Sequence, residues 1–233
     1  MQRFPLLALL TSTTVLLSAC GGGGDSEGVP PATTYNAAAA WQNLLTTSTS
    51  YAVSGVASNG TSFQISFGIA PASGEAFPVT GVGANRNIIN ATISSNGVAL
   101  ATTATETFFD DSFLQVGTRS TGEGEPTTCE VGVSAALPST AATIGASGSL
   151  SVRNVLDGCE PESSVVSTIT ETWSIEFHDG RAYFCTGATE QDTATPPNIS
   201  TEKDCVEIAE DGSLGTRARV TLTDSGVTLL ATN

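Results

Sequence analysis

The chain has 233 residues and a formal net charge of −15, with 23 acidic residues against 8 basic ones. This balance repels phosphates and anionic lipid surfaces, which argues against nucleic acid as a partner. Charged residues make up only 13% of the chain, and small and hydroxyl side chains are abundant, as is typical of exported β-proteins.

The first twenty residues have the pattern of an export signal. Arg3 precedes an apolar run from Phe4 to Leu17, and two small residues separate that run from Cys20. The run is too short to span a bilayer, which needs about 18 apolar residues, so a retained transmembrane segment is the less favoured alternative. An ordinary secretory cleavage site has small residues one and three positions before the cut, whereas Leu17 stands third before Cys20.

The tetrad Leu17-Ser18-Ala19-Cys20 resembles the lipobox of bacterial lipoproteins. The resemblance implies that residues 1–19 are a signal peptide removed before Cys20, and that Cys20 carries acyl chains of the palmitate type. Two or three such chains hold a protein on a membrane durably. Gly21 in place of an aspartate implies, by the same resemblance, the outer membrane of a two-membrane bacterium. The alternative is a secreted protein with an unmodified Cys20.

Residues 20–34 are rich in Gly and Pro without periodicity, which predicts a flexible tether before a domain at 35–233. Asn36 is a suitable N-cap for a helix over residues 37–45. Within it Trp41, Leu44 and Leu45 share one face at helical spacing. Trp41 would pack on a sheet or, as the alternative, stack on a ligand.

From residue 50 onward the hydropathy pattern has period two, with turn dipeptides between the runs. Asn59-Gly60 and Asn96-Gly97 are the strongest hairpin signals, because both turn positions favour positive φ. Loops are expected at 71–77, 119–128 and 186–211. The expected strands are 51–57, 62–69, 88–93, 98–102, 103–109, 113–116, 165–177, 181–185, 216–223 and 227–231.

Residues 165–177 alternate most regularly, with Ile169, Trp173 and Ile175 on one face. The turn at Asp179-Gly180 has two residues or a bulged three, and this choice decides whether Tyr183 or Phe184 points inward.

The pattern predicts an all-β fold, an antiparallel β-sandwich or barrel-like domain with one short N-terminal helix. Residues 63–67 resemble 173–177, and 91–100 resemble 220–229, in the same order. This echo suggests a duplicated β-unit over 50–117 and 146–232. The alternative is that strands of similar composition look alike.

Beyond Cys20 an even number of cysteines remains, as expected in an oxidising compartment. Sequential pairing, Cys129 with Cys159 and Cys185 with Cys205, closes two short polar loops and would contribute roughly 3 to 4 kcal/mol for each bridge. A zinc site is disfavoured, because no Cys-x-x-Cys spacing occurs and His178 is the one histidine.

Catalytic signals are sparse, and the sequence predicts no catalytic residue and no cofactor. His178 precedes a turn, and no Gly-x-Ser-x-Gly motif supplies a nucleophile for it. Paired carboxylates could still serve a hydrolase, either Asp110 with Asp111 or Glu171 with Glu176.

Two further groups are candidate binding sites. One acidic cluster could hold a cation or could be a solvated acidic surface. One aromatic and acidic patch could bind a ligand, or its phenylalanines could belong to the core and its aspartates to a turn. The cluster is Asp204, Glu207, Glu210 and Asp211, and the patch is Phe108, Phe109, Asp110 and Asp111.

These features predict a lipid-anchored protein of the cell envelope that acts as a non-catalytic binding module. Its partner would be a protein or a glycan, with the membrane contacted through the N-terminal lipid. The alternatives are a carboxylate-dependent hydrolase of envelope or extracellular polymers and a purely structural surface lipoprotein.

Overall fold

The computed structural model describes residues 33–193 and 199–233. Within these residues the chain forms one helix and twelve strands. The elements are α1 (Ala37–Thr46), β1 (Thr49–Ala57), β2 (Ser62–Ala76), β3 (Gly83–Ser95), β4 (Val98–Phe109), β5 (Gln115–Gly122), β6 (Thr128–Ala135), β7 (Ser147–Leu156), β8 (Val165–His178), β9 (Arg181–Asp192), β10 (Ile199–Ile208), β11 (Leu214–Asp224) and β12 (Val227–Thr232).

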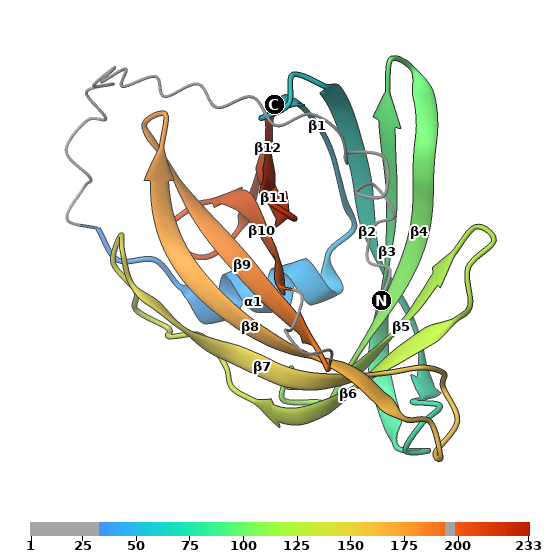
Figure 1. The fold of residues 1–233 in the computed structure, drawn as a ribbon. Helices are drawn as coiled ribbons and strands as arrows, with labels where there is room; N and C mark the ends of the chain where they lie inside the picture. Colours follow the sequence, from blue (N-terminus) through green and yellow to red (C-terminus); the bar gives the residue numbers. More distant parts are fainter. Residues whose placement is uncertain (1–32, 194–198) are drawn as a thin grey trace.

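The strands form one closed antiparallel barrel in which each strand pairs with its neighbours in the sequence (Figure 1). The first and last strands close it, with Ser54 opposite Thr232 and Ala57 opposite Leu229. The predicted all-β fold with one short helix is confirmed, as a barrel rather than a sandwich. The diameter of a barrel grows with the number of its strands, and side chains alone can fill the interior of an eight-stranded barrel. Twelve strands enclose a wider interior.

The meander gives the barrel two different ends. The β1–β2, β3–β4, β5–β6, β7–β8, β9–β10 and β11–β12 turns share one end, named the open end here. The remaining turns share the opposite end of the barrel. This end is named the helix end, because α1 forms hydrogen bonds with two of its turns. Trp41 Nε1 donates to the carbonyl of Phe113 at 3.0 Å, and Asn43 Nδ2 donates to that of Gly212 at 2.9 Å.

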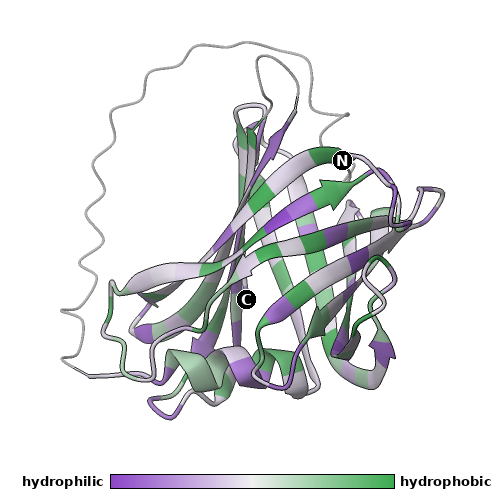
Figure 2. Cartoon of the chain, turned by 90° about the horizontal axis from the view of Figure 1, so that it is seen from below, coloured by the Kyte–Doolittle hydropathy of each residue, from purple (hydrophilic) through white to green (hydrophobic). Residues whose placement is uncertain are grey.

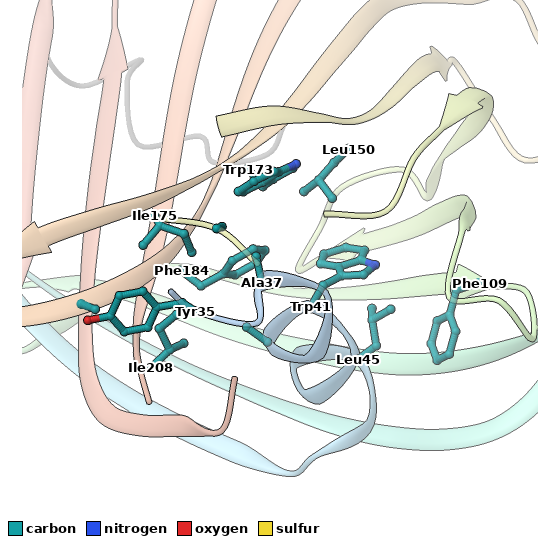
Figure 3. Packing of buried hydrophobic residues seen from close by; sticks show 13 residues of the cluster. Tyr35, Ala37, Trp41, Leu45, Phe109, Leu150, Trp173, Ile175, Phe184 and Ile208 are labelled. Atoms are coloured by element: carbon teal, nitrogen blue, oxygen red, sulfur yellow. The ribbon is translucent and has the colours of Figure 1, made fainter. Parts of the chain in front are cut away.

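Helix α1 begins where the sequence predicts, since Asn36 Oδ1 accepts a hydrogen bond from the Ala39 amide at 3.0 Å. Trp41 and Leu45 lie against residues of β7, β8 and the end of β4, including Leu150 and Trp173 (Figure 3). Trp41 is only 7% exposed, so it packs on the sheet as predicted. No helix in the described part of the chain is long and apolar enough to cross a bilayer.

Hydrophobic and hydrophilic residues alternate along many strands (Figure 2). The turn at Asp179-Gly180 has two residues, with φ of 51° and 75°, and places His178 opposite Arg181. Phe184 consequently joins the interior cluster around α1. Tyr183 lies on the outer face and is still buried, in contact with the second disulfide.

Several strands are longer than the sequence predicts. The expected loop at 71–77 continues β2 past a bulge between Ala72 and Glu75, and the two strands expected within 98–109 are the single strand β4. The expected loop at 119–128 contains the end of β5, and the one at 186–211 contains the end of β9 and all of β10. These segments carry polar residues on both faces, so their hydropathy does not alternate.

The cysteines form the sequential pairs Cys129–Cys159 and Cys185–Cys205. Cys129 belongs to a small cluster on the outer face with Phe77 and Phe108. A Cβ at Gly117 would lie 2.5 Å from Phe77 Cζ, so this cluster needs a glycine there.

The echoed segments occupy comparable places in the barrel. Residues 63–67 and 173–177 lie on β2 and β8, which both run from the open end to the helix end. The second echoed pair forms the β3–β4 and β11–β12 hairpins at the open end. The β9–β10 hairpin separates the later pair and has no counterpart between β2 and β3, so a duplicated unit stays a prediction.

Candidate ligand-binding cavity in the barrel lumen

The barrel lumen contains a cavity of about 220 Å³. At the helix end it is bounded by Trp41, Leu44 and Leu45 of α1, and at the open end by Glu125 and Pro126 of the loop between β5 and β6. The cavity therefore extends along the barrel between its two ends.

One side of the cavity, named the apolar wall here, consists of aliphatic and aromatic side chains. It is formed by β2, β3 and β11, with one residue from β10. Ile93 is fully buried, and Ile65 and Val220 are nearly so. The residues are Ile65, Phe67, Ile69, Ile89, Ala91, Ile93, Val206, Val220 and Leu222.

The facing side, named the polar wall here, carries hydroxyl, amide and charged groups in register. Asn87 of β3 is opposite Thr107 of β4, which is opposite Thr118 of β5, which is opposite Glu130 of β6. A second row follows one step toward the open end. It comprises Thr105, Ser120 and Thr128.

The polar wall continues into a buried ionic network around Arg153, which is 1% exposed. Its Nε donates to Glu130 at 2.8 Å, and its Nη1 donates to Gln115 at 2.8 Å and to Ser151 at 2.5 Å. Nη1 also pairs with Glu171. A buried charge is stable only when it is paired and hydrogen-bonded, and these four side chains meet that need.

Two buried oxygens of the polar wall have no hydrogen-bond partner within residues 33–193 and 199–233. They are Asn87 Oδ1 and Thr118 Oγ1, on residues that are 1% and 2% exposed and that line the cavity. The Asn87 amide nitrogen is occupied, since it donates to the Leu44 carbonyl at 3.4 Å. An unmet buried acceptor costs about 1 to 3 kcal/mol, so this wall is suited to a bound group that donates hydrogen bonds.

Three carboxylates gather on the next part of the lumen. Glu202 of β10 and Glu171 of β8 are both opposite Ala188 of β9, one strand away on either side. Asp204 lies two residues from Glu202 on the same face and is opposite Thr186. All of these residues line the cavity, so the small side chains of Thr186 and Ala188 lie between the three carboxylates.

No protein-family model, curated protein or solved structure matches the chain. The geometry of the lumen is therefore the basis for assigning a site.

The aromatic and acidic patch expected from the sequence does not form one surface. Phe108 is buried in the outer cluster with Phe77, whereas Phe109 packs inside with α1. Asp110 accepts hydrogen bonds from the amides of Ser112 and Leu114, and Asp111 accepts one from Asn85. The alternative that placed the phenylalanines in the core and the aspartates in a turn is correct.

The acidic cluster near Cys205 is also dispersed. Asp204 faces the lumen, whereas Glu207 lies on the outer face and pairs with Arg181. Glu210 and Asp211 lie in a loop at the helix end, where hydrogen bonds from Ser213 lower the pKa of Asp211. In the described ranges one group has metal-ligand proximity, Glu176 with Cys185 and Cys205, and both sulfurs are in a disulfide.

The carboxylate pair expected for a hydrolase is separated by the sheet. Glu171 faces the lumen, whereas Glu176 lies on the outer face, where it contacts His178 Nε2 at 2.9 Å and Lys203 Nζ at 2.7 Å. Burial alone would raise the pKa of Glu176, but hydrogen bonds from His178, Lys203 and Ser174 lower it from 4.5 to about 2. Cys20, the expected lipidation site, lies outside the described residues.

Sequence reasoning missed the residues that give the cavity its polarity, among them Asn87, Gln115 and Arg153. Arg153 stands alone among Leu150, Val152 and Val155, and a single charge within such a run could have indicated a buried ionic group. Nothing in the sequence alone pairs it with Glu130 and Glu171, because three different strands supply them.

Proposed function

We propose that this chain is a lipid-anchored protein of the cell envelope whose barrel binds a small amphipathic molecule. The observation that carries the proposal is a cavity of about 220 Å³ with an apolar wall facing a polar wall. An apolar cavity of roughly 150 Å³ is enough to bind benzene, so this one has room for a larger group. This is a non-catalytic binding role, with a small ligand in place of a glycan or protein partner.

The two walls suit two parts of such a ligand. A hydrocarbon part would lie against Ile65, Phe67 and Ile93, where burial of each methylene is favourable by about 0.8 kcal/mol. A polar part would lie toward Asn87 and Thr118, whose oxygens have no partner in the described part of the chain. A purely polar or purely apolar ligand would leave one wall unsatisfied.

The proposed anchor would be joined to the barrel at one of its two ends. The described chain begins at the helix end, where the Tyr35 amide donates to the Ala142 carbonyl at 2.8 Å. A flexible tether from Cys20 would thus join the barrel at its helix end. By the resemblance to lipoproteins, Gly21 in place of an aspartate favours the outer membrane of a two-membrane bacterium as the location of this protein.

Titration with a neutral fluorescent apolar probe, N-phenyl-1-naphthylamine, tests the cavity. We expect saturable binding to the full chain, weakened at least about tenfold by Ala91→Phe, because the new ring would occupy the apolar wall. The matched control is Ala52→Phe, which adds the same ring to an exposed position on β1. Circular dichroism and urea unfolding establish that both variants fold.

Absence of saturable binding to the full chain would contradict the cavity proposal. So would an Ala91→Phe variant that is folded and binds the probe as the control does.

The anchor is tested separately by cell fractionation. We expect the full chain in the membrane fraction and a Cys20→Ala variant in the soluble fraction, because the variant lacks the acylated thiol. A Cys20→Ala variant that stays with the membrane would show that the lipobox assignment is wrong.

A further inference from the structure

The two buried oxygens that lack a partner belong to one row of the polar wall. Asn87 of β3 is opposite Thr107 of β4, and Thr107 is opposite Thr118 of β5, so the three residues share the lumen face. Neighbouring strands are about 4.8 Å apart, and the curvature of a barrel brings inward side chains closer together. A single bound group therefore has both Asn87 Oδ1 and Thr118 Oγ1 within its reach.

The hydrogen bond from Asn87 to helix α1 determines what this residue offers to a ligand. Its Nδ2 donates to the Leu44 carbonyl at 3.4 Å. A carbonyl oxygen only accepts, so the amide nitrogen has to face Leu44, and the unpartnered atom has to be the amide oxygen. Oδ1 thus requires a donor. Thr118 Oγ1 belongs to a hydroxyl group, which can donate or accept.

The lumen face around these two oxygens is neutral. Among the residues described on β3, β4 and β5, none that lines the cavity is charged, and Thr105 and Ser120 add further hydroxyl groups. The next strand brings the first charge, Glu130 opposite Thr118, and Arg153 Nε donates to it at 2.8 Å. A charged head group would lose its water here without gaining an oppositely charged partner on these three strands, which is costly.

The same face of β3 changes from polar to apolar along its length. Asn87 lies toward the helix end, where it contacts Leu44 of α1. Residues two apart in a strand share a face, so Ile89, Ala91 and Ile93 follow Asn87 toward the open end. All four line the cavity. A ligand with its polar part at Asn87 would therefore direct its hydrocarbon part toward the open end.

We propose that the lumen binds a neutral amphiphile whose hydroxyl or amide head group lies at Asn87 and Thr118. The head group donates a hydrogen bond to Asn87 Oδ1 and forms a second one with Thr118 Oγ1. The hydrocarbon chain lies along Ile89, Ala91 and Ile93, with its end toward the open end of the barrel. This inference rests on the proposed binding function and specifies the chemical class and the orientation of the ligand.

The test compares four probes that share an eight-carbon chain and differ in the head group. They are octanol, 1-methoxyoctane, octanoate and octylammonium, each used below its solubility or micellar limit. Affinity is measured from the displacement of N-phenyl-1-naphthylamine bound to the full chain.

We expect octanol to bind about tenfold more tightly than 1-methoxyoctane, because the ether lacks the donor that Asn87 Oδ1 requires. This order is the reverse of the one that hydrophobicity alone would give. Octanoate and octylammonium should bind more weakly than octanol, since burial of either charge on this neutral face is unfavourable.

Equal affinity for octanol and 1-methoxyoctane would overturn the inference and leave the binding function standing, because water and not the ligand would then meet the two oxygens. Tightest binding of either charged probe would also overturn it. If the naphthylamine binds and none of the four probes displaces it, the inference alone fails. If neither the naphthylamine nor any of the four binds, both proposals fail.

A double variant locates the head group. Asn87→Leu with Thr118→Val removes both oxygens at similar side-chain volume and should reduce the preference for octanol over 1-methoxyoctane to less than about twofold. The matched control is Asn90→Leu with Thr92→Val, which makes the same exchanges on the outer face of β3. A double variant that is folded by circular dichroism and keeps the full preference would contradict this placement.

The tryptophans report the direction of the chain. Trp41 and Trp173 are the two tryptophans of the sequence, and both belong to the cluster around α1. Bromine quenches tryptophan fluorescence at short range, so 2-bromooctanol should quench it more strongly than 8-bromooctanol. Equal quenching, or stronger quenching by 8-bromooctanol, would overturn the proposed orientation.

Discussion

The apolar and polar walls of the barrel are built from the same kind of strand and differ in what they turn inward. On the apolar wall the inward residues are Ile, Phe, Val, Leu and Ala, and outward residues such as Gln64 and Ser66 are exposed. On the polar wall the inward residues include Thr105, Glu130 and Arg153, while the outward residues are mixed, with polar Glu106 and Arg119 beside apolar Phe108. A strand can be buried without alternating in hydropathy.

The two walls also differ in what stabilises them. The apolar wall depends on burial of hydrocarbon, centred on fully buried residues such as Ile93. The strands of the polar wall and those that follow it carry both disulfides, Cys129–Cys159 and Cys185–Cys205, and the network of Arg153. Cross-links and paired charges there add to the hydrophobic clusters that these strands form with α1 and on the outer face.

Reduction of both disulfides should cause the largest loss of stability, and this loss should differ between the two walls. Each bridge is expected to contribute about 3 to 4 kcal/mol, given loop closures of 30 and 20 residues. Hydrogen exchange measured by mass spectrometry should show loss of protection in β6 and β9–β10 before β1–β3. Equal loss in both regions would mean that the walls do not differ in this way.

Replacing Arg153 should be the most damaging single substitution on the polar wall. Arg153→Met leaves Glu130 and Glu171 without their cation, and we expect a loss of about 3 to 5 kcal/mol in urea unfolding. The exposed control, Arg217→Met, should change stability by less than about 0.5 kcal/mol.

Neutralising Glu130 and Glu171 should restore the stability lost in the Arg153→Met variant. Adding Glu130→Gln and Glu171→Gln to Arg153→Met should restore more than half of the lost stability, since no unpaired charge remains. Failure of this rescue would show that the packing of the arginine, and not its charge, is what the wall requires.

Placing a polar residue in the apolar wall, or an apolar residue in the polar wall, should reduce stability by an intermediate amount. Ile93→Thr places a hydroxyl in the apolar wall and should cost about 2 to 3 kcal/mol. Thr105→Val on the polar wall loses a 3.2 Å hydrogen bond with Ser120 and should cost less than about 1 kcal/mol. Similar losses in thermal unfolding would contradict the distinction between the walls.

A smaller effect than that of Ile93→Thr is expected on the outer face of the barrel, where Glu176 joins β8 to β10 through Lys203. Its pKa is lowered from 4.5 to about 2 in the folded state, so its contribution is present above pH 4.5 and is lost as the pH falls toward 2. Glu176→Gln should cost about 1 to 2 kcal/mol at pH 7, allowing for solvent screening.

Urea unfolding from pH 7 to pH 2 measures this difference, which should shrink below pH 4.5 and vanish near pH 2. Glu162→Gln, in an exposed loop, serves as the control and should show no such dependence. A constant difference between Glu176→Gln and the parent chain would exclude the ion-pair explanation.

Much of the barrel could be predicted from local patterns. The Asn96-Gly97 and Ser225-Gly226 turns have positive φ at both residues, as expected from backbone preferences, whereas the Asn59-Gly60 turn has it only at Gly60. The alternation of β8 follows from its buried and exposed faces. The cap at Asn36 and the sequential disulfides depend likewise on residues close in the chain.

The candidate site could not be predicted in the same way. β10 has Glu202 and Asp204 on its inward face, and its sequence therefore looks like an acidic loop. Period-two hydropathy requires that the two faces meet different environments, and a polar lumen removes that difference. The strands lining the site were thus the ones hardest to identify.

The sequence determined the all-β class, the capped helix, the hairpin turns and the pairing of the cysteines, because each depends on neighbours along the chain. The tertiary structure alone decided the closure of β1 on β12, the division of the lumen into two walls and the meeting of Arg153 with Glu130 and Glu171. Closing a barrel fixes the register and the inward face of every strand together, and no single strand carries that information.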